Sequence, residues 1–182
     1  AQEIFGRFPE VDFGIYECPM PWKRLVSLDF LRKVAPEGRM VFLKDTCCDY
    51  ELIRERLKAV EGTPLKIFNA NAQSWYDSYC HGSAGYNGVM ANFHPDLYKW
   101  AYDHKDSDPE KAQLVAHFLT TAAMIEMRAY PVSAKYHQNL VDVPMSLVTR
   151  SADAAKLDKN ARGEVESLIA MENYVRKQLG IL

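Results

Sequence analysis

A lysine and a tyrosine, each at the end of a short apolar run, are the residues of this sequence best placed to do chemistry. Lys44 follows the run Met40–Leu43, and Tyr16 ends the run that begins at Val11. A lysine at the end of an apolar strand is partly desolvated, which disfavours its charged form and lowers its pKa. A neutral amine can attack a carbonyl carbon to form a Schiff base, and a nearby phenol can relay the protons. The alternative is that Lys44 only marks where a strand meets water.

An alternation of short apolar runs with helical periodicity must position these two residues. We expect strands over residues 11–16, 40–44, 65–69 and 85–90, each followed by a helix, with Asp49 as an N-cap and Pro95 as a first helical residue. Four strand–helix units in succession predict parallel strands with right-handed crossovers. In such folds the active groups lie at the carboxyl ends of the strands. Neither GxGxxG nor a P-loop occurs, so these nucleotide-binding motifs are excluded.

The pattern changes after Asp108 and becomes purely helical. Pro109 opens a helix on which Leu114, Phe118, Ala122 and Ile125 form an apolar stripe, and a last helix spans about 161–179. These helices either cover the outside of the sheet or form a subunit interface.

Composition excludes several classes of protein. The chain has 182 residues, a net charge of -2 and 48% hydrophobic residues, which argues against disorder and against nucleic-acid binding. No apolar run is long enough for a membrane span, and the first residues do not resemble a signal peptide. The four cysteines form no CxxC pair, which favours reduced thiols in a cytoplasmic protein. The five histidines lack metal-binding spacing, so we expect no metal site.

Adjacent cysteines follow Lys44 directly before the expected helix. A helix beginning near Asp49 would lower the pKa of a nearby thiol, which would make Cys47 or Cys48 reactive. The alternative is that both are small residues that line a pocket or pack behind it.

Three sequence blocks, at 14–19, 41–46 and 85–92, together resemble the dihydrodipicolinate synthase / N-acetylneuraminate lyase family. Those proteins are class I Schiff-base aldolases built on a (β/α)8 TIM barrel. The blocks match the fifth, sixth and eighth strands in order and spacing, and residues 65–69 fall where the seventh belongs. The resemblance implies an α/β fold: the C-terminal half-barrel, strands 5–8, over residues 1–106, and a C-terminal helical extension over residues 107–182.

The resemblance also implies roles for individual residues. Lys44 matches the lysine that forms the imine with a 2-oxo acid, usually pyruvate, and Tyr16 matches the tyrosine that shuttles protons. Ala70 lies where the family has a small residue lining the pocket, and the backbone of Asn87 falls at the position facing the pyruvate. The resemblance further implies no cofactor, an aldehyde-type second substrate and a homo-oligomer, a tetramer in related proteins.

One departure from the family pattern bears on the second substrate. The arginine that binds the aldehyde's carboxylate in the synthases is replaced here by Pro21. Lys23 and Arg24 follow it, and the sequence leaves open whether their side chains point into the site. Glu17 and Trp22 therefore suggest a different second substrate.

A full barrel needs about 250 residues, and this chain has 182. The first four units and the Gly-Thr-Thr-Gly-Glu-like segment that binds the pyruvate carboxylate have no counterpart here. We expect a fragment of a longer protein in preference to two associating half-barrels. The sequence thus predicts a lyase or aldolase that makes or breaks a carbon–carbon bond. The alternative is a non-catalytic half-barrel that acts as a scaffold or assembly module.

Overall fold

The computed structural model describes residues 1–181 and forms two compact units, Ala1–Gly88 and Val89–Leu182. The first unit carries all the strands that the structure describes. Its elements are α1 (Gln2–Arg7), β1 (Phe13–Tyr16), α2 (Leu28–Val34), the 3-10 helix η1 (Ala35–Glu37), β2 (Met40–Asp45), α3 (Tyr50–Ala59), β3 (Lys66–Asn69), α4 (Trp75–Cys80) and β4 (Gly85–Tyr86).

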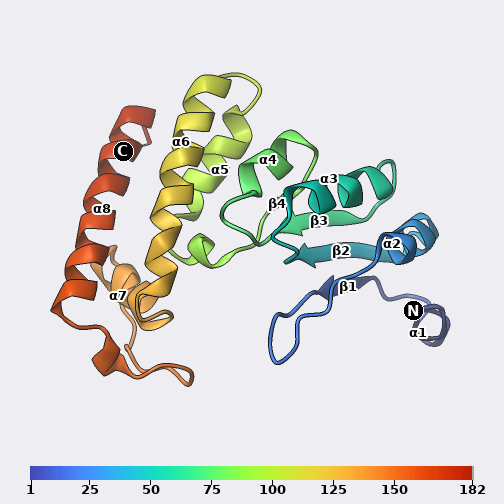
Figure 1. Ribbon diagram of the computed structural model, residues 1–182, viewed down its shortest axis with the longest axis horizontal. Coiled ribbons are helices and arrows are strands. Elements are labelled where there is room, and N and C mark those ends of the chain that lie inside the picture. Colours follow the sequence, from blue (N-terminus) through green and yellow to red (C-terminus); the bar gives the residue numbers. More distant parts are fainter. Residues whose placement is uncertain (182) are drawn as a thin grey trace. The chain divides into compact units, whose positions relative to one another are not determined.

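The four strands form one parallel sheet in the order β1-β2-β3-β4 (Figure 1). The register pairs Tyr16 with Lys44, Lys44 with Phe68, and Phe68 with Gly85. These residues therefore form one row across the sheet. The predicted α/β class with parallel strands is confirmed.

One face of the sheet is covered by helices. Leu43 and Ile67 belong to a buried apolar cluster with Leu31 of α2 and with Ile53 and Leu57 of α3. The helix α3 begins where the sequence predicts, because the Asp49 side chain accepts a hydrogen bond from the Leu52 backbone N–H at 2.8 Å. The apolar residues of α3 therefore pack against this covered face of the sheet.

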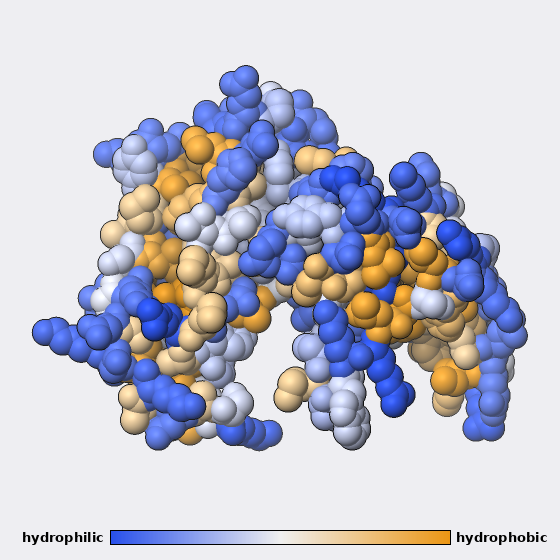
Figure 2. Space-filling view, viewed as in Figure 1, coloured by the Kyte–Doolittle hydropathy of each residue, from blue (hydrophilic) through white to orange (hydrophobic). Residues whose placement is uncertain are grey.

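The opposite face of the sheet is open within the described residues. Tyr16 is exposed, whereas Phe42, Lys44 and Phe68 are only partly buried. The rings of Phe42 and Phe68 contact each other in a tilted arrangement, with their centroids 5.0 Å apart. Hydrophobic side chains reach the surface over the strands in Figure 2. Parallel sheets normally have both faces covered, so this open face is unusual.

The fourth strand is shorter than the predicted run over residues 85–90. It ends at Tyr86, and a 3-10 helix, η2 (Val89–Asn92), takes up the rest of the run. The Tyr86 ring folds back over Gly88 and leaves no room there for a Cβ atom. Gly88 permits this close approach, and the strand pairing stops there.

The second unit is helical. It contains α5 (Pro95–His104), α6 (Pro109–Ala122), the 3-10 helix η3 (Ala123–Met127), α7 (Val132–Leu140), the 3-10 helix η4 (Ala154–Lys156) and α8 (Lys159–Leu179). The last helix ends at Gly180, whose φ of 70° is left-handed, as the sequence predicts. No helix among the described residues is long and apolar enough to cross a bilayer. Since α5 belongs to this unit, the compact units divide earlier in the chain than the expected boundary at residue 106, and that boundary stays a prediction.

The predicted apolar stripe of α6 is wrong. The buried residues of this helix are Ala112, Val115, Ala116 and Leu119, whereas Leu114 is 69% exposed. The helix is apolar on more than one face, and the small alanines allow close packing, so the alanine face is buried. The other face borders a hollow of about 740 Å³ between α6, η3 and α8 that is lined partly by methionines.

A buried ionic cluster joins three helices of the second unit. The carboxylate of Glu172 on α8 lies 2.6 Å from His94 Nδ1 and 3.0 Å from His137 Nε2 of α7, and all three side chains are fully buried. Arg176 contacts Glu172 at 3.3 Å and forms an ion pair with Asp96 of α5. Burial by itself raises the pKa of a carboxyl, but the hydrogen bonds from His137 and His94 outweigh it and lower the pKa of Glu172 to about 2.

This cluster predicts an acid-sensitive stability. A carboxyl whose pKa is lower in the folded state stabilises the fold above its unfolded pKa, 4.5 here, and that stabilisation is lost as the pH falls toward 2. Glu172→Gln should lower the free energy of unfolding at pH 7 by about 3 kcal/mol, and the difference from wild type should shrink between pH 5 and pH 2. Urea unfolding followed by circular dichroism measures both.

Glu166→Gln is the matched control, since Glu166 is an exposed carboxylate of the same helix and glutamine keeps an oxygen that can accept the hydrogen bond from the Tyr136 hydroxyl. It should change the stability by less than about 0.5 kcal/mol. A deficit in Glu172→Gln that stays constant from pH 7 to pH 2 would contradict the assignment.

Candidate active site

Tyr16 and Lys44 meet at the carboxyl ends of neighbouring strands. They are paired in the β1–β2 register, and the Lys44 Nζ atom lies 4.5 Å from the centroid of the Tyr16 ring. The backbone N–H of Glu17 donates to the Lys44 carbonyl oxygen at 3.3 Å and closes the ladder there. The structure thus brings together the two residues that the sequence predicts as catalytic.

Tyr16 is held as a neutral phenol. Burial, and then the neighbouring Cys18 thiol, raise the pKa of Tyr16 above its usual 10.0. The side chain keeps half of its surface exposed, and its hydroxyl carries a proton at neutral pH. It can therefore donate that proton to a partner on the open face.

A charged group lies directly behind each of these residues. Glu17 follows Tyr16 and Asp45 follows Lys44, and both turn to the helix-covered side, where Arg56 of α3 lies between them. The three side chains are almost completely inaccessible to solvent. Burial opposes the charge of Arg56, but its hydrogen bonds and ion pairs with Glu17 and Asp45 outweigh this and raise its pKa.

The sequence prediction missed Arg56 and its pairing with Asp45, although Asp45 was expected at the strand end beside Lys44. Arg56 lies three residues after Ile53, on the apolar stripe of α3, and a lone charge on a buried stripe is the signal that could have identified it. Its partners could not be found in this way, because they come from two strand ends that are distant in the sequence.

The structure contradicts the expectation that the helix beginning near Asp49 lowers the pKa of the Cys47 thiol. Burial, and next the hydrogen bond and charge of Asp45, raise the pKa of the Cys47 thiol to about 12. The Cys47 backbone N–H donates to Asp45 Oδ1 at 2.9 Å, so thiol and carboxylate lie in the same tight loop. Cys48 then takes a left-handed φ of 58°, which turns the chain toward α3. The interpretation of Cys47 as a thiol with a lowered pKa is therefore wrong.

Two further predicted residues lie at the same end of the sheet. The Ala70 backbone N–H donates to the Asp45 carbonyl at 2.9 Å, and the Asn87 backbone N–H donates to the Asn69 carbonyl at 2.8 Å. Both N–H groups already have partners within the sheet. A bound molecule would therefore meet the carbonyls or side chains of Ala70 and Asn87.

The other two predicted substrate contacts are placed differently. The carboxylate of Glu17 is occupied by Arg56 and by the backbone N–H groups of Val26 and Thr46, at 2.7 and 2.9 Å, so its contacts are structural. Trp22 projects from the loop after β1 and is 76% exposed. Their predicted contacts with a second substrate stay predictions.

Lys23, in the same loop, brings a second ammonium group near the strand ends. Its Nζ atom lies 3.9 Å from the Sγ atom of Cys48, in the loop after β2. The side chain therefore reaches across the two loops that follow Tyr16 and Lys44. It is a cation that could meet an anionic group near this site.

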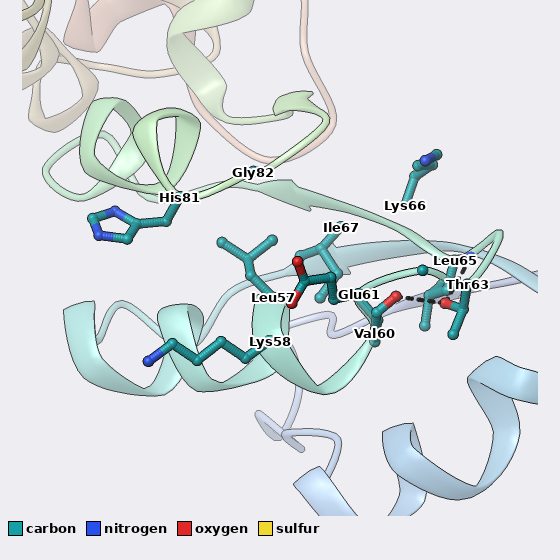
Figure 3. A pocket seen from close by; sticks show the side chains of 11 residues that line it. Leu57, Lys58, Val60, Glu61, Thr63, Leu65, Lys66, Ile67, His81 and Gly82 are labelled. Atoms are coloured by element: carbon teal, nitrogen blue, oxygen red, sulfur yellow. Dashed lines mark hydrogen bonds between the residues drawn. The ribbon is translucent and has the colours of Figure 1, made fainter.

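A separate cavity of about 390 Å³ lies at the opposite, amino end of β3 (Figure 3). Leu57, Ile67 and Glu61 point into it, whereas Lys58 and Lys66 point away. Its lining residues Leu57 and Ile67 belong to the helix-covered side of the sheet, whereas Lys44 lies on the open side. We therefore place the candidate active site at the strand ends. Among residues 1–181, no cluster of histidine, cysteine or acidic side chains is arranged to hold a metal ion.

Solved structures share this fold. A sialic acid aldolase from Ruminococcus gnavus matches with a TM-score of 0.80 and 16% identity, covering 97% of this chain and 60% of that chain. Dihydrodipicolinate synthase from Thermotoga maritima matches with a TM-score of 0.74 and 16% identity, covering 100% and 60%. A prophage protein of the dihydrodipicolinic acid synthase family from E. coli K12, solved in complex with pyruvate, matches at 0.75 and 17%, covering 88% and 55%.

These matches confirm the predicted fold: four parallel strands and their helices correspond to part of the TIM barrel of dihydrodipicolinate synthases. No family model and no curated protein matches the sequence. The chain spans about 60% of the length of the solved chains that it matches.

The raised pKa of Cys47 predicts that its thiol is alkylated slowly. The thiolate is the nucleophile in alkylation, and a thiol with a pKa near 12 is only about one part in 10⁴ ionised at pH 8. Cys47 should react with iodoacetamide at least about tenfold more slowly than the exposed Cys18 and Cys80. Time-resolved alkylation with fragment-level mass spectrometry measures each rate. Equal rates at pH 8 would show that Asp45 and burial do not hold the Cys47 proton.

Proposed function

We propose that this protein is a Schiff-base-forming lyase or aldolase that makes or breaks a carbon–carbon bond in a 2-oxo acid. The observation that carries the proposal is the position of the Lys44 Nζ atom, 4.5 Å from the centroid of the Tyr16 ring at the carboxyl end of the sheet. A primary amine and a protonated phenol in one place are the two groups that imine formation needs.

In the proposed reaction, the neutral Lys44 amine attacks the ketone carbon of the 2-oxo acid. The Tyr16 phenol protonates the developing alkoxide, and the carbinolamine loses water to give the protonated imine. A cation over an aromatic face is stabilised, so the Tyr16 ring also favours the positive charge of this imine. The Tyr16 phenolate takes a proton from the substrate as a bond to the adjacent carbon breaks, and the imine accepts the released electron pair and becomes an enamine. The Tyr16 phenol later returns that proton to the enamine carbon.

Pyruvate is the first candidate for the 2-oxo acid. It is the molecule bound in the prophage protein from E. coli K12, which shares the fold at 17% identity. An aldehyde-type second substrate follows from the same chemistry, because the enamine formed from the imine is a carbon nucleophile. We propose that an anionic group of this second substrate meets Lys23, which lies near the strand ends.

A second candidate function is that of a non-catalytic half-barrel, which acts as a scaffold or assembly module. The open face of the sheet favours it, because Tyr16 is exposed and Phe42 and Phe68 are only partly buried. Such a protein would use this face to bind another polypeptide. It would have no need for a nucleophilic Lys44.

Imine trapping with pyruvate and sodium borohydride tests the enzyme proposal. Borohydride reduces an imine to a stable secondary amine, so a pyruvate-derived adduct should appear on Lys44 when peptides of the folded protein are mapped by mass spectrometry. Lys44→Arg should abolish this adduct, because its guanidinium does not form the imine at neutral pH.

Lys66→Arg is the matched control, because Lys66 is an exposed lysine on the same face of the sheet, one strand away. It should leave trapping on Lys44 unchanged. If folded wild-type protein gives no adduct with pyruvate or with a panel of 2-oxo acids, the aldolase proposal is wrong and the scaffold is favoured.

A further inference from the structure

A single guanidinium joins the two strand ends that carry Tyr16 and Lys44. Arg56 Nη2 lies 2.9 Å from Glu17 Oε1, and Arg56 Nη1 lies 3.1 Å from Glu17 Oε2 and pairs with Asp45. Nη2 also donates to the Val26 carbonyl at 2.6 Å, which ties down the loop between β1 and α2. All three charged side chains are buried.

The alternation of side chains along a strand connects this cluster with the site. Successive side chains of a strand point to opposite faces of the sheet. Tyr16 and Lys44 therefore face the open side, while Glu17 and Asp45, one residue later, face Arg56. A backbone shift at Glu17 or Asp45 would also move the side chain that precedes it, Tyr16 or Lys44.

The strand β1 needs such a constraint. It is four residues long, lies at the edge of the sheet, and already changes register between Phe13 and Gly14. A slip of one residue would turn Tyr16 to the other face of the sheet. The Thr46 hydroxyl, which donates to the Glu17 carbonyl at 2.8 Å, adds a second link between the same strand ends.

Stability alone does not account for the cluster. Two carboxylates share one guanidinium away from water, and the desolvation of buried charges generally cancels much of their attraction. Apolar side chains of similar volume often give equal or greater stability at such positions. The directional contacts of two carboxylates with one guanidinium add a defined geometry between the strand ends, and we take this geometry to be the role of the cluster.

We propose that Arg56 is a positioning residue of the active site: by bridging Glu17 and Asp45 on the covered side of the sheet, it fixes the register at which Tyr16 and Lys44 meet on the open side. This inference rests on the proposed function for its catalytic consequence. Its geometric consequence holds for the protein whether or not it is an enzyme.

Arg56→Lys is the direct test. Lysine keeps the charge but lacks the planar fork that reaches both carboxylates, so the fold should survive while the bridge is lost. A misplacement of about 1 Å can lower a reaction rate by about 100-fold, and we expect a decrease of that size in the rate of imine trapping. Arg54→Lys is the matched control, since Arg54 lies on the same helix and pairs instead with Asp77. Arg54→Lys should form the trapped imine with pyruvate at the wild-type rate.

A spectroscopic measurement separates this inference from the proposed function. Reductive methylation with ¹³C-formaldehyde gives each lysine a methyl signal, and the Tyr16 ring below Nζ should shift the signal of Lys44 upfield. Lys44→Arg assigns the signal, and Tyr16→Leu gives its position without the ring. In Arg56→Lys the signal should move to the Tyr16→Leu position, while in Arg54→Lys it should stay.

The outcomes distinguish the two claims. The positioning role is overturned if Arg56→Lys traps pyruvate at the wild-type rate, or if its Lys44 methyl signal stays at the wild-type position. If the wild-type protein itself does not trap pyruvate, the proposed function fails, and the Lys44 signal alone decides the role of Arg56. Should Arg56→Lys not fold, Glu17→Gln replaces it. This variant keeps the shape but removes one acceptor from the bridge, so it should shift the signal in the same direction, and an unchanged signal counts against the inference.

Discussion

Two buried carboxylates that share one guanidinium hold the ends of β1 and β2 at a fixed spacing, and the candidate site depends on that interaction. Glu17 and Asp45 extend to Arg56 on one side of the sheet, so Tyr16 and Lys44 must extend to the other. Hydrogen bonds from Val26 and Thr46 complete the coordination of Glu17. In our proposal, the position of the Lys44 amine over the Tyr16 ring is thus set from behind the sheet.

The open side of the sheet is the second constraint on function. A barrel strand is normally buried on both faces, but the row through Tyr16, Lys44 and Phe68 is partly exposed here. The chain also spans about 60% of the solved chains that share its fold. A surface of this kind favours either a site that another polypeptide helps to enclose or a docking face. Imine formation at Lys44 would favour the enclosed site over the docking face.

Much of the first unit could be predicted from local sequence signals. Asp49 as the N-cap of α3 and the carboxyl ends of β1 and β3 follow from the preferences of single residues, as does Gly180 as the C-cap of α8 in the second unit. The end of β4 was predicted four residues too late. The pairing of Tyr16 with Lys44 followed from the succession of strand–helix units. The stripe of α6 could not be predicted, because the helix is apolar on two faces and the choice between them depends on its neighbours. The bridge through Arg56 could not be predicted either, since it joins positions 17, 45 and 56 only in the folded chain.

Exchange of the methyl protons of pyruvate in D₂O tests the central claim most directly. Formation of the imine at Lys44 makes these protons acidic, and proton transfer by Tyr16 then replaces them with deuterium without any second substrate. The account predicts that the folded protein removes the methyl signal in proton NMR, that Lys44→Met abolishes this exchange, and that Tyr16→Phe slows it at least about 100-fold. Exchange that persists in Lys44→Met, or its absence in the folded wild-type protein, would contradict the account.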